Sequence, residues 1–213
     1  MPWFQLRYVF FLFISLQVAA SGQMLILGDS LTEGYGVGES KAYPQVLEQK
    51  LKQAKKEVKV IASAISGSTT ATGPDRFAWI SKRPDVMEHL VLFLGGNDVL
   101  RSIDPAVSKM NLKKTLQAMK TYQVKNAKSK VKIYLVEMKV PSNYGASIIK
   151  AWQKLYIDLK KDKELDFILI PFPLAKIALK KELNLADGIH PNEKGHELLA
   201  EYFFQFFTKA GYL

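Results

Sequence analysis

Short apolar runs alternate along the chain with longer segments in which apolar and charged residues are mixed. The runs are nearly continuous in apolar residues, as expected for strands that are buried on both faces. Strands are therefore predicted at 24–28, 58–64, 89–95, 131–137 and 166–172. In the segments between them, apolar residues recur every three or four positions, which is typical of amphipathic helices. Helices are predicted at 43–57, 105–128, 146–162 and 190–213.

The alternation of strands and helices predicts the architecture. A strand, a helix and a second strand form a right-handed crossover, and repeated crossovers build a parallel sheet covered on both faces. The predicted fold class is therefore α/β, with three α/β/α layers around a central, mainly parallel five-stranded sheet. Ligands of such sheets bind beyond the carboxyl ends of the strands. The loops that follow the strands are thus where chemistry is expected.

The N-terminus differs from the rest of the chain. A single cation, Arg7, precedes the apolar run VFFLFISLQVAA, and small residues follow it. The run is shorter than the roughly 20 residues that span a bilayer, and this arrangement is typical of a secretory signal peptide. We predict a signal peptide over 1–20 with cleavage after Ala20, a single domain over 21–213, and an exported bacterial protein, periplasmic or secreted. An uncleaved N-terminal anchor is the alternative.

Composition and charge exclude several classes of protein. The chain is 48% hydrophobic and 23% charged, which is typical of a globular protein and not of a disordered one. It contains no cysteine, which excludes disulfides and a lipoprotein anchor. The chain has a net charge of +10, or +9 without Arg7. The lysines that contribute to it are spread over the polar faces of several predicted helices. No nucleic-acid-binding motif accompanies them, so no nucleic-acid partner is predicted. Weak attraction to an anionic membrane surface stays open, and we expect a monomer.

Four loops near the carboxyl edge of the predicted sheet carry short polar motifs that contain glycine. They are GDS at 28–30, SGSTT at 66–70, GGND at 95–98 and LADGIHPNEKGH at 185–196. Each motif alone has an ordinary interpretation, because Ser30 can cap a helix and glycine and Asx residues form turns. Parallel strands end at the same edge of a sheet, however, so residues from these loops can converge.

Together the loops supply the parts of an acyl-transfer site. A serine hydroxyl becomes nucleophilic when a neighbouring imidazole accepts its proton, and His190 can serve Ser30 in this way. Asp187, three residues earlier, can hold the other ring nitrogen and stabilise the imidazolium. The tetrahedral intermediate needs preorganised donors, for which the candidates are the backbone N–H groups of Ser30 and Gly67 and the side-chain amide of Asn97. Gly67 suits this role because it has no Cβ.

The remaining histidines compete poorly for the role of base. His89 opens an apolar run and is expected at the edge of its strand, and His196 is expected on a helix face. No group of residues has the spacing of metal ligands, and no Walker or dinucleotide-binding motif is present. Neither a metal nor another cofactor is predicted.

The motifs in combination resemble the four sequence blocks of the SGNH (GDSL) hydrolase superfamily. The order and spacing of ILGDSLTEGYG, ISGST, LGGNDVLR and DGIHPNEKGH are most similar to the exported bacterial thioesterase/lysophospholipase/arylesterase type. The resemblance covers essentially the whole chain after the leader. It implies Ser30 as nucleophile, Asp187 and His190 as the rest of the triad, Gly67 and Asn97 as oxyanion donors, a flavodoxin-like fold and no cofactor.

The resemblance also suggests where a substrate lies. In relatives the loop that corresponds to VPSNYG borders the acyl pocket, so Val140, Pro141 and Tyr144 are candidates for substrate contact. Simple loop packing is the alternative for Val140 and Pro141. The segment 69–85 fits the family less clearly. If it lines the pocket, the residues that shape chain-length preference are Phe77, Trp79 and Ile80.

The predicted function is therefore that of an exported serine esterase. It hydrolyses small acyl esters, thioesters or lysophospholipids through a Ser-His-Asp triad and an acyl-enzyme intermediate. A carbohydrate O-deacetylase of the same superfamily is the alternative. A non-catalytic lipid-binding protein is disfavoured, because a binder has no need for Asp187, His190 and Asn97 together.

Overall fold

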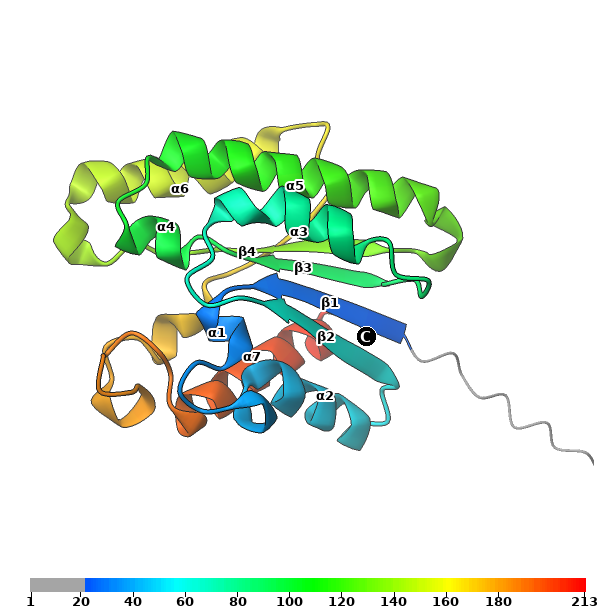
Figure 1. The fold of residues 1–213 in the computed structure, drawn as a ribbon, viewed down its shortest axis with the longest axis horizontal. Coiled ribbons are helices and arrows are strands. Elements are labelled where there is room, and N and C mark those ends of the chain that lie inside the picture. Colours follow the sequence, from blue (N-terminus) through cyan, green and yellow to red (C-terminus); the bar gives the residue numbers. More distant parts are fainter. Residues whose placement is uncertain (1–21) are drawn as a thin grey trace, which may run out of the picture.

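The computed structural model describes residues 22–213, in which one sheet lies between two layers of helices (Figure 1). The predicted signal peptide over 1–20 lies outside the described residues. Between residues 22 and 213, no helix is long and apolar enough to cross a membrane.

The five predicted strands are all present, and every pair of neighbours is parallel. They are β1 (Gly22–Gly28), β2 (Val58–Ala64), β3 (His89–Phe93), β4 (Lys132–Val136) and β5 (Ile168–Ile170), in the order β2-β1-β3-β4-β5. The α/β prediction is confirmed. Because β2 and β3 lie on opposite sides of β1, the carboxyl end of β1 is a topological switch point, where α/β sheets bind ligands. Ser30 lies two residues beyond that end.

Seven α-helices and six short 3₁₀ helices surround the sheet in the described chain. The α-helices are α1 (Ser30–Glu33), α2 (Tyr43–Gln53), α3 (Gly73–Ile80), α4 (Gly96–Leu100), α5 (Pro105–Lys125), α6 (Ala146–Lys161) and α7 (Glu193–Lys209). The 3₁₀ helices are η1 (Glu39–Lys41), η2 (Thr70–Thr72), η3 (Ala127–Ser129), η4 (Ser142–Tyr144), η5 (Pro173–Lys176) and η6 (Lys181–Leu183). Helices α2 and α7 cover one face of the sheet, and α3, α5 and α6 cover the other (Figure 1).

Helix α3 is an element that the hydrophobic pattern did not predict. Gly73 and Pro74 suggest a loop, but proline is well tolerated in the first turn of a helix. The helix has only 8 residues, too few for its period to stand out, and its apolar positions Phe77 and Ile80 are buried. The hypothesis that the segment 69–85 shapes chain-length preference through Phe77, Trp79 and Ile80 is not supported. Phe77 and Ile80 are buried in the core, Trp79 is 74% exposed, and none of the three lines the cavity described below.

The core on the α2/α7 side of the sheet is built from stacked aromatic rings. Tyr43 is fully buried and stacks on Phe203, with ring centroids 5.1 Å apart. His196, which is expected on a helix face, lies on the buried face of α7. Its side chain is fully buried, and its Nδ1 accepts a hydrogen bond of 3.3 Å from the backbone N–H of Tyr43. His89, the first residue of β3, is also buried.

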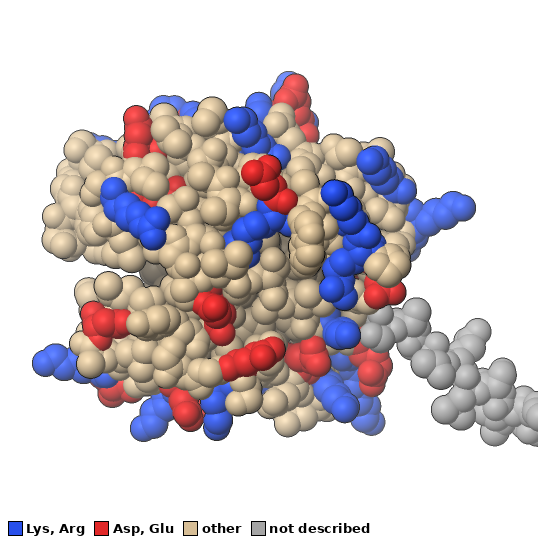
Figure 2. Space-filling model, in the orientation of Figure 1, with Lys and Arg blue, Asp and Glu red and all other residues tan. Residues whose placement is uncertain are grey.

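Many lysines of the helices are paired with acids. The ion pairs Lys109–Asp158, Lys113–Asp162 and Lys120–Asp166, at 3.0, 2.6 and 3.3 Å, connect α5 to α6 and the segment that follows it. On the face drawn in Figure 2, basic and acidic side chains are interspersed rather than gathered into one basic stripe. The excess of positive charge is therefore distributed, as expected for solvated helix faces.

Candidate active site

Ser30 is held at the point where β1 turns into α1. The side chain of Asp29 caps this short helix by accepting a 3.1 Å hydrogen bond from the N–H of Leu31. Asp29, not Ser30, therefore serves as the N-cap, and Ser30 is the first residue of the helix. Its side chain lies against the cavity with a residue exposure of only 7%. The hydroxyl is thus available to another group rather than bound to its own backbone.

Ser30, His190 and Asp187 are hydrogen-bonded in series. The Nε2 atom of His190 lies 2.9 Å from the Oγ of Ser30, and its Nδ1 lies 2.7 Å from Oδ2 of Asp187. The structure therefore brings together three residues, the first and last of which are 160 positions apart in the sequence. In this geometry His190 can accept the Ser30 proton at Nε2 while Asp187 holds the Nδ1–H.

The loop that carries the acid and the base is stabilised from within. Asp187 accepts hydrogen bonds from the backbone N–H groups of Ile189 and His190, at 2.9 and 3.0 Å. Partial burial raises the pKa of Asp187, but the backbone N–H and ring of His190 and the N–H of Ile189 outweigh it and lower the pKa to about 2. The carboxylate is therefore ionised wherever the imidazole could act as a base. An N–H···O bond of 2.8 Å from Leu185 to His190 and an antiparallel bridge between Asn184 and Pro191 close the loop.

Tyr35 is a residue of the site that the sequence did not suggest. Its ring lies 4.6 Å from the imidazole of His190, centroid to centroid, with a tilt of 40° between the planes. The phenol therefore restricts the rotation of the imidazole by contact with its ring. The motif GYG at 34–36, directly after α1, has no periodicity or charge by which this contact could be found.

The candidate oxyanion donors lie on two neighbouring loops. The amide of Asn97 lines the cavity and donates to the carbonyl oxygen of Ser68 at 3.0 Å and to Oδ2 of Asp29 at 3.3 Å. Gly67 precedes Ser68 and has a φ of 76°, which favours glycine. Among the described residues, the backbone N–H groups of Ser30 and Gly67 donate to no other protein group. Gly67 does not line the cavity itself. It is connected to the site because Ser68, the next residue, accepts the hydrogen bond from Asn97, which does line the cavity.

A buried carboxylate holds these two loops together. Asp98 is fully buried and accepts hydrogen bonds from the N–H of Thr70 at 2.9 Å, from the hydroxyl of Ser108 at 2.8 Å, and from the hydroxyl of Thr70 at 2.5 Å. A buried carboxylate is tolerated only with such partners. The network fixes the GGND loop against the loop that contains Gly67, and so fixes the positions of both candidate donors.

Asp29 is a second buried carboxylate beside the serine. Burial raises the pKa of Asp29 to about 6, although the N–H of Leu31, the charge of His190 and the amide of Asn97 oppose this effect. The side chain lies in the cavity wall next to Ser30 and is 3% exposed. Below about pH 6 it is protonated in the folded protein.

A cavity of about 200 Å³ opens beside Ser30 and His190. Its walls are mainly apolar and come from α4, from the loop after β4 and from the segment after β5. The apolar side chains are Leu31, Val99, Leu100, Met138, Pro141, Leu174, Ile177, Ala178, Leu179 and Ile189. The arrangement can hold an acyl chain with its carbonyl carbon next to the serine.

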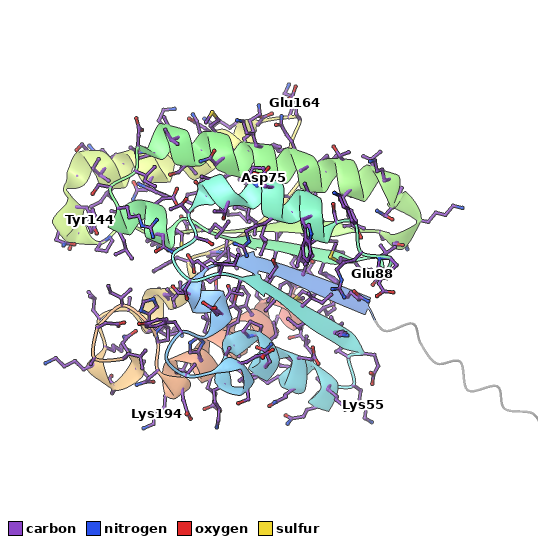
Figure 3. The ribbon with its side chains drawn as sticks, in the orientation of Figure 1. Lys55, Asp75, Glu88, Tyr144, Glu164 and Lys194 are labelled. Atoms are coloured by element: carbon purple, nitrogen blue, oxygen red, sulfur yellow. The ribbon has the colours of Figure 1, made fainter. Side chains whose placement is uncertain are left out.

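The structure places the three predicted substrate contacts differently. Pro141 lines the cavity, whereas Val140 and Tyr144 are partly buried and pack against the core. Tyr144 lies near the carboxyl end of the sheet but is tied to the start of α6 (Figure 3). The wall formed by Leu174 and Ile177 was not predicted. The apolar residues after the fifth strand, in LIPFPLAKIAL, were the signal that could have indicated it.

The two histidines outside the site predict how stability depends on pH. Burial lowers the pKa of His89 and of His196 to about 4 each, with the charges of Lys132 and His190 acting in the same direction. Between pH 6.5 and 4 the unfolded chain therefore binds more protons at these histidines than the folded protein does. The free energy of unfolding falls as the pH falls for this reason. Asp29 opposes this trend, because the folded protein binds its proton near pH 6 and the unfolded chain only near 3.8.

We expect the substitution His89→Gln to remove one histidine's share of this pH dependence. The difference in unfolding free energy between the variant and the parent should change by on the order of 3 kcal/mol between pH 7 and pH 4. Urea unfolding at graded pH measures it. The substitution Tyr134→Phe, which removes the hydroxyl 3.1 Å from Nδ1 of His89 but keeps the imidazole, is the control and should retain the parent's slope. Parallel curves for His89→Gln and the parent would contradict the assignment.

The fold and the site define a class of protein. A parallel α/β/α sheet with serine, histidine and aspartate hydrogen-bonded in series at its carboxyl edge is an arrangement of serine hydrolases. Residues 26–198 match the model of the GDSL-like lipase/acylhydrolase family, and the chain belongs to this family. It is a carboxylic ester hydrolase, and the resemblance to SGNH hydrolases is confirmed.

Individual relatives cover nearly the whole chain. It is 32% identical over 197 residues to the thioesterase 1/protease 1/lysophospholipase L1 of Escherichia coli strain K12, covering 92% of this chain and 88% of the relative. It is 31% identical over 206 residues to an arylesterase of Vibrio mimicus, covering 96% and 97%. Among solved structures, the psychrotrophic esterase EstA of Pseudoalteromonas, inhibited by monoethylphosphonate, superposes with a TM-score of 0.76 at 25% identity, covering 90% of this chain and all of that one.

Within residues 22–213, no group of three or more His, Asp or Glu side chains has the arrangement of a metal site.

Proposed function

We propose that the protein hydrolyses acyl esters, and acyl thioesters, through an acyl-enzyme intermediate on Ser30. The observation that carries the proposal is the series of hydrogen bonds from Ser30 Oγ to His190 and from His190 to Asp187, at 2.9 and 2.7 Å. These side chains come from two segments that lie 160 positions apart in the sequence and meet beside a cavity. An acyl-transfer mechanism needs them there.

In the first half of the proposed reaction, Ser30 Oγ attacks the carbonyl carbon of the ester while its proton passes to Nε2 of His190. The carbonyl π bond breaks and a tetrahedral oxyanion forms. Collapse of this intermediate expels the alcohol or thiol, which takes the proton from His190. Asp187 stays ionised and stabilises the imidazolium during this half.

In the second half, His190 takes a proton from water and the resulting hydroxide attacks the acyl-serine. The new tetrahedral intermediate expels Ser30 Oγ, which recovers the proton, and the carboxylic acid leaves. In both halves the oxyanion is stabilised by the N–H of Ser30, the N–H of Gly67 and the amide of Asn97. For Asn97 this requires exchange of its longer bond, 3.3 Å to Asp29, for the oxyanion. Such donors typically contribute about 10²–10³ in rate.

The cavity walls support an acyl chain rather than a sugar as the group next to the serine. Apolar side chains such as Leu174, Ile177 and Met138 can bury methylene groups, whereas a sugar ring would leave its hydroxyls without partners there. The relatives named for thioesterase, lysophospholipase and arylesterase activity support ester, thioester and lysophospholipid substrates for this chain as well. We therefore place the carbohydrate O-deacetylase second.

We further propose that the protein is exported and that residues 1–20 are its signal peptide. The proposal is supported by Arg7, the apolar run and the small residues around Ala20. Mass spectrometry of the N-terminus of protein recovered from expressing cells tests it. A chain that begins at Ser21 is the expected result, and a chain that keeps residues 1–20 would contradict cleavage.

A panel of substrates with graded acyl chains tests the proposed function. We expect kcat/KM for p-nitrophenyl esters to rise by up to about fourfold per added methylene, because each buried CH₂ contributes about 0.8 kcal/mol. The rise should stop when the cavity is full. Acyl-thioesters of coenzyme A and lysophosphatidylcholine of the same chain lengths should be hydrolysed as well.

Acetylated xylan in the same panel separates the two candidate functions. Turnover of acetylated xylan above that of every longer acyl ester would favour the deacetylase. A correctly folded protein that hydrolyses no member of the panel would overturn both.

A further inference from the structure

Three apolar side chains lie at the mouth of the cavity and face water. Leu179 is 87% exposed, Ile189 is 49% exposed and Leu100 is 48% exposed, yet each of them also borders the cavity. They come from three separate segments, namely the turn after η5, the loop of the candidate base and the end of α4. We call these three residues the apolar rim.

Leu179 has a backbone conformation that leucine rarely adopts. Its φ is 66°, in the left-handed region, where side chains with a Cβ are disfavoured. The turn is fixed on both sides of it by backbone hydrogen bonds, from Ala178 to Leu174 at 2.8 Å and from Lys180 to Ile177 at 3.2 Å. A large apolar side chain is thus displayed to solvent on a strained, hydrogen-bonded turn, and strain of this kind is concentrated at functional sites.

Cations flank the apolar rim and have no acidic partner. Lys139 lines the cavity, Lys180 and Lys181 follow Leu179, and Arg101 follows Leu100. Between residues 22 and 213, none of these four makes an ion pair, in contrast to the paired lysines on α5. The acids nearest to them in sequence have other contacts or lie in the same exposed segment. Asp98 is buried and bonded to Thr70 and Ser108, and Glu137 accepts a hydrogen bond from the N–H of Phe172. Asp104 caps α5, Asp187 binds His190, and Glu182 follows Lys181.

The end of the molecule at which the strands terminate is hollowed (Figure 2). The hollow lies between two lips, and uncharged residues form most of the upper lip. The cavity of about 200 Å³ is smaller than the roughly 300–1,000 Å³ that enclose a drug-sized ligand, so a long acyl chain must extend past the rim.

We propose that the apolar rim and its flanking cations dock the protein on an anionic lipid surface. Leu100, Leu179 and Ile189 then enter the boundary between headgroups and acyl chains, and the cations lie among the headgroup phosphates. The acyl chain of a lipid ester passes from that surface into the cavity without crossing water. The delivery of a lipid ester to Ser30 rests on the proposed function, but binding to a lipid surface can be measured without catalysis.

The test measures partition onto vesicles with the variant Ser30→Ala as background, so that no lipid is hydrolysed. Full-length chains are expressed and all variants are compared in the same processed form. The vesicles contain phosphatidylcholine alone or phosphatidylcholine with phosphatidylglycerol. The rim variant is Leu179→Asn, because asparagine is polar and tolerates the left-handed conformation. The charge variant is Lys180→Gln with Lys181→Gln.

Matched controls lie away from the mouth. Trp79→Ser removes an apolar side chain of α3 that is 74% exposed, against 87% for Leu179. Lys55→Gln with Lys56→Gln removes two adjacent lysines, of which Lys55 lies at the opposite end of the sheet (Figure 3). Each lysine near an anionic surface contributes roughly fivefold to partition. We therefore expect the charge variant to lose about 10- to 25-fold on anionic vesicles, and Leu179→Asn to lose about fivefold or more on both compositions. The controls should stay within about twofold.

Several outcomes would overturn the proposal. The first is an equal loss of partition in the control variants and the rim variants. The second is partition that does not change with phosphatidylglycerol or with salt. The third is dimer formation without lipid, which would mean that the rim is buried against a second copy of the chain. Absence of vesicle binding by the Ser30→Ala chain, together with turnover of p-nitrophenyl esters by the parent, would reject the docking alone. Docking with no turnover of any ester would reject the proposed function alone.

Discussion

Replacing Ser30 by alanine is expected to lower kcat/KM for p-nitrophenyl esters by roughly 10⁴-fold or more, because no other group near His190 can form the acyl intermediate. The melting temperature should stay within about 2 °C of the parent. The Oγ atom makes one contact of consequence, the 2.9 Å hydrogen bond to His190, and its removal leaves only a small space beside an already open cavity.

The control for this experiment is Ser142→Ala. Ser142 is an exposed serine in η4, next to Pro141 in the cavity wall, and its replacement should leave kcat/KM within about twofold. A p-nitrophenyl phosphonate provides a second readout. The phosphorus should bond to Ser30 Oγ as p-nitrophenolate leaves, and mass spectrometry should find the adduct on the parent and on Ser142→Ala only. Residual turnover above about one per cent in Ser30→Ala would contradict the role of Ser30.

The sheet could be predicted because buried parallel strands have a distinctive pattern. Each strand is apolar on both faces, so its run stands out even where it is short, as in Ile168–Ile170. The long helices α5 and α6 were equally visible, because several turns repeat the same apolar spacing. Helix α3 could not be recognised, since 8 residues give about two turns and its first two residues, Gly73 and Pro74, are also typical of loops.

The candidate site was predictable where chemistry restricts the residue type, and not where only shape matters. Ser30, Asp187 and His190 could be singled out because few residue types can act as nucleophile, orienter and base. The cavity wall can be built from any apolar side chain of suitable size. Leu174 and Ile177 therefore were not singled out, and Val140 was a candidate for substrate contact, with loop packing as the alternative, although it packs against the core.

The burial of His196 has the same origin. A histidine on a helix that also carries charged residues gives no sign of which face it occupies. Its position is decided by Tyr43, which lies 153 residues away in the sequence. His196 accepts a hydrogen bond from the backbone N–H of Tyr43 and stacks on its ring. Its neighbour Gly195 is also buried, and it lies against the carbonyl group of Leu183 and the ring of Pro191, on either side of the loop that carries Asp187 and His190.

Gly195→Ala is expected to misplace this loop. A Cβ at position 195 would overlap the carbonyl oxygen of Leu183 and lie 2.7 Å from the Cβ of Pro191. The Leu183 carbonyl accepts the 3.0 Å hydrogen bond that closes the loop at Asn192, so relief of the overlap must move the segment on which His190 is held. A displacement of about 1 Å at a catalytic group can cost roughly 10²-fold in rate. We therefore expect kcat to fall by about 10²-fold.

The same overlap should also cost stability, because overpacking of a buried site typically costs about 1–3 kcal/mol, or roughly 2–10 °C in melting temperature for a chain of this size. The matched control is Lys194→Ala, an exposed neighbour on the same turn of α7, which should change neither quantity appreciably (Figure 3). Kinetics at a temperature well below the melting point of the variant separate the two effects. If Gly195→Ala melts earlier but keeps its kcat, α7 and not the loop has moved, and the loop does not depend on this glycine to place His190 against Ser30.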